Sequence, residues 1–351
     1  MTHSPLSPAL LEQLLQGRDL SAEQAGSLMQ LWLEGAVEPV MTGALLAGLR
    51  AKGVSGAELA AMAAVLRDAC ALPAERPSRL LVDTCGTGGA SVESGLESFN
   101  ISTAVAFTAA ACGVTVAKHG NRSASGRVGS ADVLEALGLN LGAPTTDALN
   151  ALDSVGVTFL FAPGWHPSLA GLAPLRRALG VRTVFNLLGP LVNPLRPEAH
   201  VLGVARADLL DPMAEALRHL GMQRAVVVHG HGGLDEATLS GPSELRILAD
   251  GQLRSERLDP AALGLTPAQG EALRGGDLTT NSQILRAVLE GRGTPAQREV
   301  VALNTALVLW VAGRCQSFGE GVSLALETLT SGGAWQRLEA LRSALGHSAG
   351  G

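Results

Sequence analysis

The chain has 351 residues, a formal net charge of −6 and a mean hydropathy of +0.25. This length allows two domains and a sizeable core, and the acidic balance argues against a nucleic-acid partner. No apolar run reaches the roughly 18 uncharged residues of a membrane span, and residues 1–5 do not resemble a secretion signal. We therefore expect a cytoplasmic protein without a membrane anchor.

The four cysteines do not show the spacing of a metal-binding motif. One of them, Cys112, lies in an apolar helical pattern. We interpret all four as reduced, buried thiols of a cytosolic protein: Cys70, Cys85, Cys112 and Cys315.

The first 73 residues, approximately, show only helical patterns. Ser21 with Gln24 and Ser55 with Glu58 form capping-box patterns at the starts of two of the predicted helices. The four predicted helices cover residues 8–17, 22 to about 35, 39 to 52, and 56 to about 71. Residues 76–78 then form a short linker, after which alternating strands and helices predict a largely parallel sheet.

A strand over residues 80–83 precedes the first glycine-rich loop, Gly86-Thr87-Gly88-Gly89. Glycines let backbone N–H groups approach a phosphate closely, although glycine pairs also form ordinary turns. Residues 100–103, Asn-Ile-Ser-Thr, then precede an apolar helix over 104–111. Taken alone, these polar residues are more typical of helix caps than of a ligand site.

A second such unit begins with a strand over residues 114–117 and ends with a helix over 131–137. Between them lies a loop that opens with Lys118-His119-Gly120-Asn121-Arg122 and continues through residues 123–130. Of the 26 basic residues only Lys52 and Lys118 are lysines, which suggests that a compact ammonium is required here. Two neighbouring anion loops indicate a polyphosphorylated ligand.

Asp235 and Glu236 follow a strand over residues 224–230. Adjacent carboxylates of this kind are the hard oxygen ligands that Mg²⁺ takes when it also binds phosphate. The alternative is a solvated acidic pair in a loop. Further along the chain, Thr294 and Pro295 predict the start of a long apolar helix that runs through Ala312.

With these motifs the chain resembles the anthranilate phosphoribosyltransferase family. The resemblance covers nearly the whole chain, and the motifs occur in the order found in the family. The matching stretches are GTGG at 86–89, FNIST at 99–103, KHGNR at 118–122, GSADVLEALG at 129–138, FLFAPGWHP at 159–167, VRTVFNLLGPLVNP at 181–194 and LDEA at 234–237.

The resemblance implies an α/β protein with a small all-α N-terminal domain and a large α/β domain, whose largely parallel central sheet is surrounded by helices. The small domain would comprise residues 1–76 and a returning segment at about 167–193, and the large domain residues 77–166 and 194–351. Family members are usually homodimers joined through the small domains. Their active site lies in the cleft between the domains.

The implied reaction transfers the phosphoribosyl group of 5-phosphoribosyl 1-diphosphate (PRPP) to the amine of anthranilate, with loss of pyrophosphate, in tryptophan biosynthesis. It needs no covalent or general-base residue, and none is assigned. The resemblance implies two Mg²⁺ ions per subunit, with Ser102, Asp235 and Glu236 as metal ligands.

Substrate-binding positions are also carried over from the family. Anthranilate would contact Gly86, Asn121, Arg176, His119 and His166. PRPP would contact Gly86, Gly89, Ala90, Ser98, Asn100, Ile101, Ser102, Thr103, Lys118, His119, Gly120, Asn121, Arg122, Ser123, Ala124, Ser125, Gly126 and Ser130. Ordinary structural roles remain open for His119 and His166, and a solvated helix charge remains open for Arg176.

The chain departs from the family pattern after the first glycine loop. Ala90 stands where the family usually has Asp, and the segment Ala90–Ser98 has nine residues where the family has about five. Either Glu93 replaces the missing Asp, or this loop is mobile and lies over the cleft. Two other functions stay open, a pyrimidine nucleoside phosphorylase-like enzyme and a non-enzymatic binding relative of the same fold.

Overall fold

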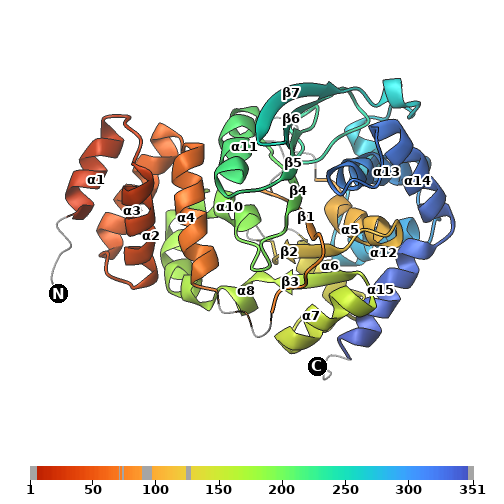
Figure 1. Cartoon of the computed structure of the whole chain (residues 1–351), viewed down its shortest axis with the longest axis horizontal. Coiled ribbons are helices and arrows are strands. Elements are labelled where there is room, and N and C mark those ends of the chain that lie inside the picture. Colours follow the sequence, from red (N-terminus) through yellow and green to blue (C-terminus); the bar gives the residue numbers. More distant parts are fainter. Residues whose placement is uncertain (1–5, 71, 73–74, 89–96, 124–127, 347–351) are drawn as a thin grey trace.

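The structure, a computed structural model, describes residues 6–70, 72, 75–88, 97–123 and 128–346. Figure 1 shows an elongated molecule with a helical part at the N-terminal end and an α/β part beyond it. This arrangement confirms the predicted fold class. Among the described residues, no helix is both long and apolar enough to cross a bilayer.

Four helices form the N-terminal part: α1 (Leu6–Leu15), α2 (Ala22–Leu33), α3 (Pro39–Lys52) and α4 (Gly56–Asp68). Both predicted capping boxes are present, because the hydroxyls of Ser21 and Ser55 accept the N–H groups of Gln24 and Glu58. The apolar faces of the helices pack into a core that includes Leu28. The end of α4 falls about one turn before the predicted end.

A seven-stranded sheet has the order β3-β2-β1-β4-β5-β6-β7. The first five strands in this order are mutually parallel. Strand β6 pairs with β5 in the antiparallel sense, and β7 pairs with β6 in the same sense, so the prediction of a largely parallel sheet is confirmed. The strands are β1 (Val82–Gly86), β2 (Val116–Gly120), β3 (Val157–Phe161), β4 (Ala199–Gly203), β5 (Arg224–His229), β6 (Ser243–Ala249) and β7 (Gln252–Leu258).

One face of the sheet is covered by C-terminal helices and by the helix that follows β1, and these pack into a single core with Val82, Val201 and Val226. The longest helix, α13, begins at the predicted cap, because the Thr294 hydroxyl accepts the Gln297 N–H. The helices of this part are α5 (Ile101–Ala111), α6 (Ser130–Ala136), α7 (Thr145–Ser154), α12 (Leu278–Leu289), α13 (Pro295–Val311), α14 (Phe318–Thr330) and α15 (Gly333–Ala344).

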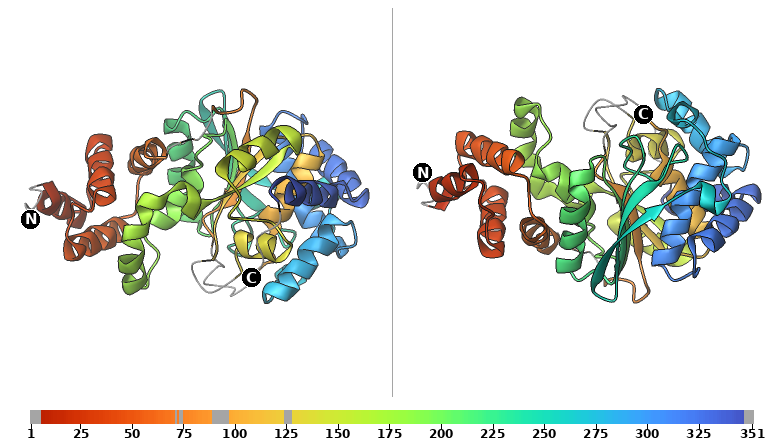
Figure 2. Two further views of the ribbon diagram at one scale, coloured as in Figure 1. Left: turned by 90° about the horizontal axis from the view of Figure 1, so that it is seen from below. Right: turned by 90° about the horizontal axis from the view of Figure 1, so that it is seen from above.

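The opposite face is covered by α11 (Leu210–His219) and by the helical part of the molecule (Figure 2). Short helices return to the N-terminal helices here: α8 (Ala162–Trp165), α9 (Ala173–Leu179) and α10 (Val184–Leu188). Short 3₁₀ helices cover Pro167–Leu172, Gly189–Leu191, Ala207–Leu209, Ala261–Leu263 and Gly270–Leu273.

Helix α10 connects the two parts of the molecule, because Val184 and Phe185 share one core with the N-terminal helices and with Leu202 of the sheet. The Phe185 ring lies 5.6 Å from the Trp32 ring, measured between centroids. Such packing is what a returning segment at about 167–193 requires. The domain boundaries themselves stay a prediction.

All four cysteines are free thiols. Cys112 and Cys315 are buried, as predicted, whereas Cys70 and Cys85 are partly exposed. The prediction of four buried thiols is therefore wrong for Cys70, which follows the end of α4, and for Cys85, which lies near the carboxyl end of β1.

Candidate active site

The central strands separate at their carboxyl ends. Strand β1 pairs with β4 along its whole length but with β2 only at Val82 and Val116. Beyond that pair, the Lys118 Nζ donates to the Thr84 carbonyl at 2.6 Å, and the Asp83 carboxylate accepts the His119 N–H at 3.1 Å. Two charged side chains thus replace ladder bonds next to the point where the strand order reverses, where open α/β sheets bind ligands.

Lys118 lies within β2, so the interpretation that it opens a loop is wrong. The strand begins two residues later than predicted and continues through Gly120, because its last residues still pair with β3. The Lys118 side chain is 2% exposed, and its ammonium also donates to the Ser102 hydroxyl at 3.2 Å. Burial lowers the pKa of Lys118. An ammonium has three N–H donors, so one remains for a ligand.

Three glycines at strand ends give Asp235 and Glu236 room to approach the sheet. A Cβ atom on Gly86 would collide with the Asp235 carboxylate, and one on Gly203 would collide with the Asp235 carbonyl. On Gly230 it would collide with the Glu236 carbonyl. The Asp235 carboxylate also accepts the Gly88 N–H at 2.9 Å, which ties the first glycine loop to the acidic pair.

The acidic pair is held in an unfavourable electrostatic environment. Burial raises the pKa of Asp235. For Glu236, burial and then the Asp235 charge raise the pKa well above its ordinary value, while Lys118 partly opposes this. The Glu236 Oε2 is buried and has no hydrogen-bond partner within the described part of the chain. A small cavity here is lined by both carboxylates and Ser102, which is a set of hard oxygen donors suited to Mg²⁺.

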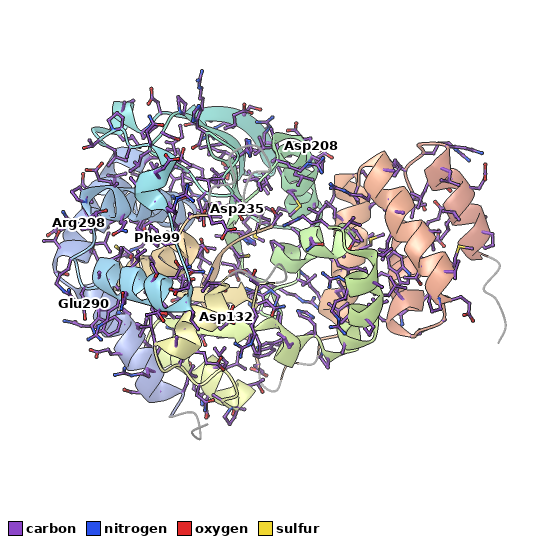
Figure 3. The ribbon with its side chains drawn as sticks, turned by 180° about the vertical axis from the view of Figure 1, so that it is seen from behind. Phe99, Asp132, Asp208, Asp235, Glu290 and Arg298 are labelled. Atoms are coloured by element: carbon purple, nitrogen blue, oxygen red, sulfur yellow. The ribbon has the colours of Figure 1, made fainter. Side chains whose placement is uncertain are left out.

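Asn304 holds this acidic loop in place, and the sequence analysis missed it. Its Oδ1 accepts the Ala237 N–H at 2.9 Å, and its Nδ2 donates to the Ala237 carbonyl at 2.8 Å. Ala237 directly follows Glu236, so the amide fixes the backbone at the acidic pair. Figure 3 shows Asp235 well inside the outline of the molecule. A single Asn in the apolar run of residues 300–309 is the sequence signal that could have identified it.

The start of α5 lacks a side-chain cap. Asn100 occupies the cap position, but its side chain makes no cap bond and donates instead to the Val128 carbonyl at 3.0 Å. The Asn100 Oδ1 and the Thr103 Oγ1 are buried without partners among the described residues. Ile101 is fully buried, and Ser98 pairs with Arg274 in an isolated bridge. Asn100 is thus the cap residue by position, but its side chain is not used for capping, and its assignment to PRPP binding stays a prediction.

In the loop after β2, some residues are packed or ion-paired and others are exposed. A Cβ atom on Gly120 would collide with the Phe159 ring and the Ser130 hydroxyl. Asn121 is exposed, whereas the Arg122 guanidinium pairs with Asp132 at 2.9 Å and with Glu135 at 2.8 Å. The Ser123 N–H faces Asp132 at 3.5 Å.

Some candidate residues lie outside the described part of the chain. They are Gly89, Ala90, Glu93, Ala124, Ser125 and Gly126. The inserted segment can be followed only at its end, where the Glu97 carbonyl accepts the Gly275 N–H at 2.8 Å.

His119 and His166 lie together where β2 meets the returning helices. Their rings meet edge to face, with centroids 5.3 Å apart. A ring nitrogen of each faces a backbone carbonyl, Gly189 for His119 at 3.1 Å and Val192 for His166 at 2.9 Å. Burial lowers the pKa of both, to about 4 for His166, so both are neutral at pH 7. The His119 Nε2 is buried without a partner in the described structure.

Arg176 and its neighbour Arg177 differ in their surroundings. The Arg176 guanidinium lies over the Phe185 ring at 5.2 Å from its centroid, and burial lowers the pKa of Arg176. Arg177 is exposed. A half-buried guanidinium stacked on a ring is a stronger candidate for a ligand contact than a solvated charge.

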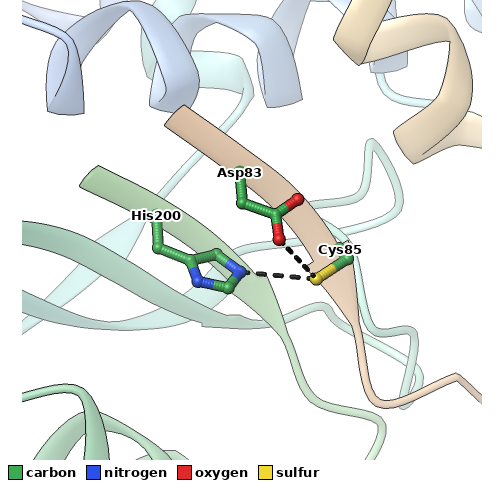
Figure 4. A group of neighbouring side chains, drawn as sticks. All are labelled: Asp83, Cys85 and His200. Carbon is green, nitrogen blue, oxygen red and sulfur yellow. Dashed lines mark hydrogen bonds between the residues drawn. The ribbon is translucent and has the colours of Figure 1, made fainter. Parts of the chain in front are cut away.

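A further polar cluster lies beside this site, on the side of β1 that faces the helical part (Figure 4). The Cys85 Sγ lies 3.6 Å from the Asp83 carboxylate and 3.4 Å from the His200 Nε2. The Asp83 carboxylate also accepts the Asn193 amide at 2.8 Å. Sequence analysis assigned no role to Asp83, Asn193 or His200, because their proximity depends on strand pairing.

Comparison with known families accounts for both parts of the molecule. A family described as "Glycosyl transferase family, helical bundle domain" matches residues 8–70. A second, described as "Glycosyl transferase family, a/b domain", matches residues 78–335. Together they cover most of the chain.

Anthranilate phosphoribosyltransferase of Parasynechococcus marenigrum (strain WH8102) is 65% identical over 345 residues, which is 97% of each chain. This chain belongs to the anthranilate phosphoribosyltransferase family. The crystal structure of the Thermus thermophilus member has a TM-score of 0.88 at 43% identity, over 96% of this chain and 99% of that one. The Saccharomyces cerevisiae member in complex with PRPP and Mg shares the fold at 24% identity, with a TM-score of 0.84 and 97% coverage of both chains.

Proposed function

We propose that the protein transfers the 5-phosphoribosyl group of PRPP to the amine of anthranilate, giving N-(5-phosphoribosyl)anthranilate and pyrophosphate, as in tryptophan biosynthesis. The observation that carries this is the convergence of Lys118, Ser102 and the Asp235-Glu236 pair at the reversal of strand order, in a chain 65% identical to a member of the family. In the reaction the bond from C1′ to the diphosphate oxygen breaks, and a bond from C1′ to the amine nitrogen forms. The amine loses one proton.

The protein contributes position and charge to this reaction. The amine is a competent nucleophile, so the site must align it with C1′ and stabilise the charge that grows on pyrophosphate. Lys118 is suited to this second task because its ammonium is already fixed by Thr84 and Ser102. A preorganised cation needs little rearrangement when charge develops.

Mg²⁺ suits the acidic part of the site. Asp235 and Glu236 would hold one ion and Ser102 a second. The Glu236 Oε2 supports the assignment because this buried atom has no hydrogen-bond partner among the described residues. When bound, Mg²⁺ supplies neutralisation of diphosphate charge. Asn304 keeps the two carboxylates aimed at this position.

PRPP would occupy the region between the first glycine loop, the start of α5 and the loop after β2. The Asn100 Oδ1 and the Thr103 Oγ1 support this placement, because both are buried without a partner among the described residues. Buried polar atoms normally form hydrogen bonds, so a ligand or water is expected beside them. Arg122 would take part only by exchanging Asp132 and Glu135 for phosphate. For the other PRPP candidates within the described residues, the carry-over from the family stands as a proposal.

Anthranilate would lie toward the returning helices. Its carboxylate would pair with the Arg176 guanidinium, and the His119 Nε2, which has no partner among the described residues, could donate or accept a further hydrogen bond beside His166. Gly86 and Asn121 would border this position from the strand ends. Because both imidazoles are neutral, they would contact the ring or its carboxylate as hydrogen-bonding groups without adding charge.

A homodimer joined through the helical part would also explain three exposed apolar side chains. Leu15, Val40 and Val181 are 68%, 87% and 59% exposed; the first two lie in α1 and α3, and Val181 lies between α9 and α10. We also propose a cytoplasmic location for this dimer. Light scattering should give a molecular mass of twice that of one chain, and Val40→Asp should lower the measured mass toward that of a single chain.

A coupled fluorescence assay tests the activity directly. Anthranilate consumption should require both PRPP and magnesium, and PRPP with magnesium should raise the melting temperature. Phosphorolysis of thymidine would instead identify a nucleoside phosphorylase. Binding of PRPP without anthranilate consumption would identify a non-catalytic relative.

A further inference from the structure

Three side chains capable of binding a metal lie on one face of two paired strands. Asp83 and Cys85 are two residues apart in β1, so they point to the same side of the sheet. His200 of β4 is the register partner of Asp83 and lies on that side too. Figure 4 shows the carboxylate and the imidazole converging on the sulfur. Asp83 and His200 are 0% and 1% exposed.

We propose that Asp83, Cys85 and His200 form a binding site for one zinc-class divalent cation, separate from the magnesium ligands Asp235 and Glu236. The metal would bind the Cys85 Sγ, the His200 Nε2 and one Asp83 oxygen. As the metal–sulfur bond forms, the thiol proton leaves to bulk water. The fourth position would be taken by water.

The distances match the requirements of zinc. Zinc bonds of about 2.3 Å to sulfur and about 2.0–2.2 Å to nitrogen and oxygen place tetrahedral ligand atoms roughly 3.4–3.6 Å apart. The observed separations are 3.4 Å from sulfur to nitrogen and 3.6 Å from sulfur to oxygen. All three ligand atoms lie within 4.8 Å of one another. Two of the three separations therefore already suit a zinc ion, and the nitrogen-to-oxygen separation is within 4.8 Å.

The surroundings orient the Asp83 carboxylate. Its Oδ1 accepts the His119 N–H, and its Oδ2 accepts the Asn193 amide. Asn193 is itself fixed, because its amide donates to the Ala117 carbonyl and its oxygen accepts the Leu195 N–H. Hydrogen-bonded carboxylates of this kind support metal sites. Sulfur and imidazole ligands favour zinc-class ions over magnesium.

His200 is in the protonation state that a metal requires. Burial lowers its pKa to about 4, so the imidazole is neutral at pH 7 and presents a lone pair. The competing description is a hydrogen-bonded chain, in which the thiol donates to a neighbour and no metal binds. Spectroscopy of the complete protein separates the two descriptions.

The experiment titrates Co²⁺ into the full-length protein under reducing conditions, with excess Mg²⁺ present to occupy oxygen-ligand sites. We expect about one Co²⁺ per chain to give a near-ultraviolet sulfur-to-metal charge-transfer band, with intense visible bands of a four-coordinate ion. Zn²⁺ should abolish the bands, and more Mg²⁺ should not. Absence of a charge-transfer band at saturating Co²⁺ would overturn the proposal.

Variants assign the band to this cluster. Cys85→Ser should abolish it, and His200→Gln should weaken Co²⁺ binding at least tenfold. Cys112→Ser is the control, since Cys112 is also a free thiol but is buried in the core that contains α5, and it should leave the band unchanged. A band that persists in Cys85→Ser would place the metal elsewhere and overturn the proposal.

X-ray absorption of the Zn²⁺-loaded wild type provides a test that does not depend on variant folding. The proposal requires one sulfur among the zinc ligands, together with nitrogen or oxygen. A shell without sulfur would overturn it.

Discussion

The two halves of the proposed site are built differently. The donor half consists of the strand ends and the start of α5, which carry Gly86, Ser102, Lys118 and the acidic pair. The acceptor half consists of α8, α9 and α10, which have only four, seven and five residues. Helices this short depend on packing against their neighbours.

The difference shows in how each half tolerates change. In the donor half, glycines at strand ends leave no space for a Cβ atom, and the charges are buried close together. The acceptor half is held by ring contacts, such as Arg176 on Phe185 and His119 on His166. We therefore expect substitutions in the donor half to cost much more activity than substitutions in the acceptor half.

The largest effect is expected for the acidic pair. Asp235→Asn with Glu236→Gln should lower kcat/KM for PRPP by roughly 10²–10³-fold, because the diphosphate would lose its metal-borne charge stabilisation. The measurement is steady-state kinetics at several Mg²⁺ concentrations, with EDTA as the zero point. The exposed Glu244→Gln serves as control and should behave as wild type. Full activity of the double variant in excess EDTA would contradict the assignment.

Lys118 tests the donor half a second way. Lys118→Arg should lower kcat/KM for PRPP by at least tenfold, because a larger planar guanidinium replaces an ammonium fixed between the Thr84 carbonyl and the Ser102 hydroxyl. Lys118→Ala should lower it further. Lys52→Arg is a matched control, since Lys52 is also largely buried and paired with Asp19 and Glu58.

Agreement of wild type, Lys118→Arg and Lys118→Ala within a factor of about two would be far below the tenfold change that 1.4 kcal/mol represents. Lys118 would then have no part in PRPP binding. The expectation that substitutions in the donor half cost more activity than those in the acceptor half would then rest on the acidic pair.

Arg176 tests the acceptor half. Arg176→Ala should raise the KM for anthranilate by about tenfold or somewhat more and leave the KM for PRPP nearly unchanged. A charge-assisted pair contributes about 1.5–3 kcal/mol, and the half-buried position of this guanidinium favours the lower end of that range. Arg177→Ala is the control, as Arg177 is the exposed neighbour on the same helix. Equal effects of the two substitutions on anthranilate KM would show that the stacked guanidinium has no special role.

Local signals predicted the elements that frame the site. The capping boxes at Ser21 and Ser55 and the cap at Thr294 placed three helix starts correctly, because a cap is a contact across three residues. The glycine loop and the acidic pair were recognised for a similar reason, since each is continuous in sequence. The paired carboxylates lie at a strand's carboxyl end, as expected.

Contacts between distant segments could not be predicted in this way. Asn193 reaches Asp83 across 110 residues, and Asn304 reaches Ala237 across 67. The Lys118 position was misjudged for the same reason, because the strand continues by pairing with β3, which lies far along the chain. The Asn100 side chain does not make the cap bond that is typical of its residue type at a helix start, because its amide donates instead to the Val128 carbonyl, 28 residues away.

The smallest expected effect is that of Glu236→Gln on stability, and it shows whether a residue needed for function in the donor half destabilises the fold. Burial and the Asp235 charge raise the pKa of Glu236, so its ionised form is less stable in the folded than in the unfolded chain. A carboxyl group whose pKa is raised on folding favours the folded state below its unfolded pKa, and loses that contribution as the pH rises through the folded pKa. Glu236→Gln removes this titration.

We expect Glu236→Gln to raise the melting temperature by a few degrees, about 1–3 °C, when no metal is present. The gain over wild type should grow as the pH increases from about 5 to 8, because more of the wild-type carboxylate is then ionised. Saturating Mg²⁺ should reverse the order, since only wild type gains the full binding energy of the ion. Glu244→Gln should show neither trend. A melting temperature of Glu236→Gln below wild type at every pH without metal would contradict this prediction. It would mean that the buried acidic pair stabilises the fold, whereas we expect it to lower the stability of the metal-free protein.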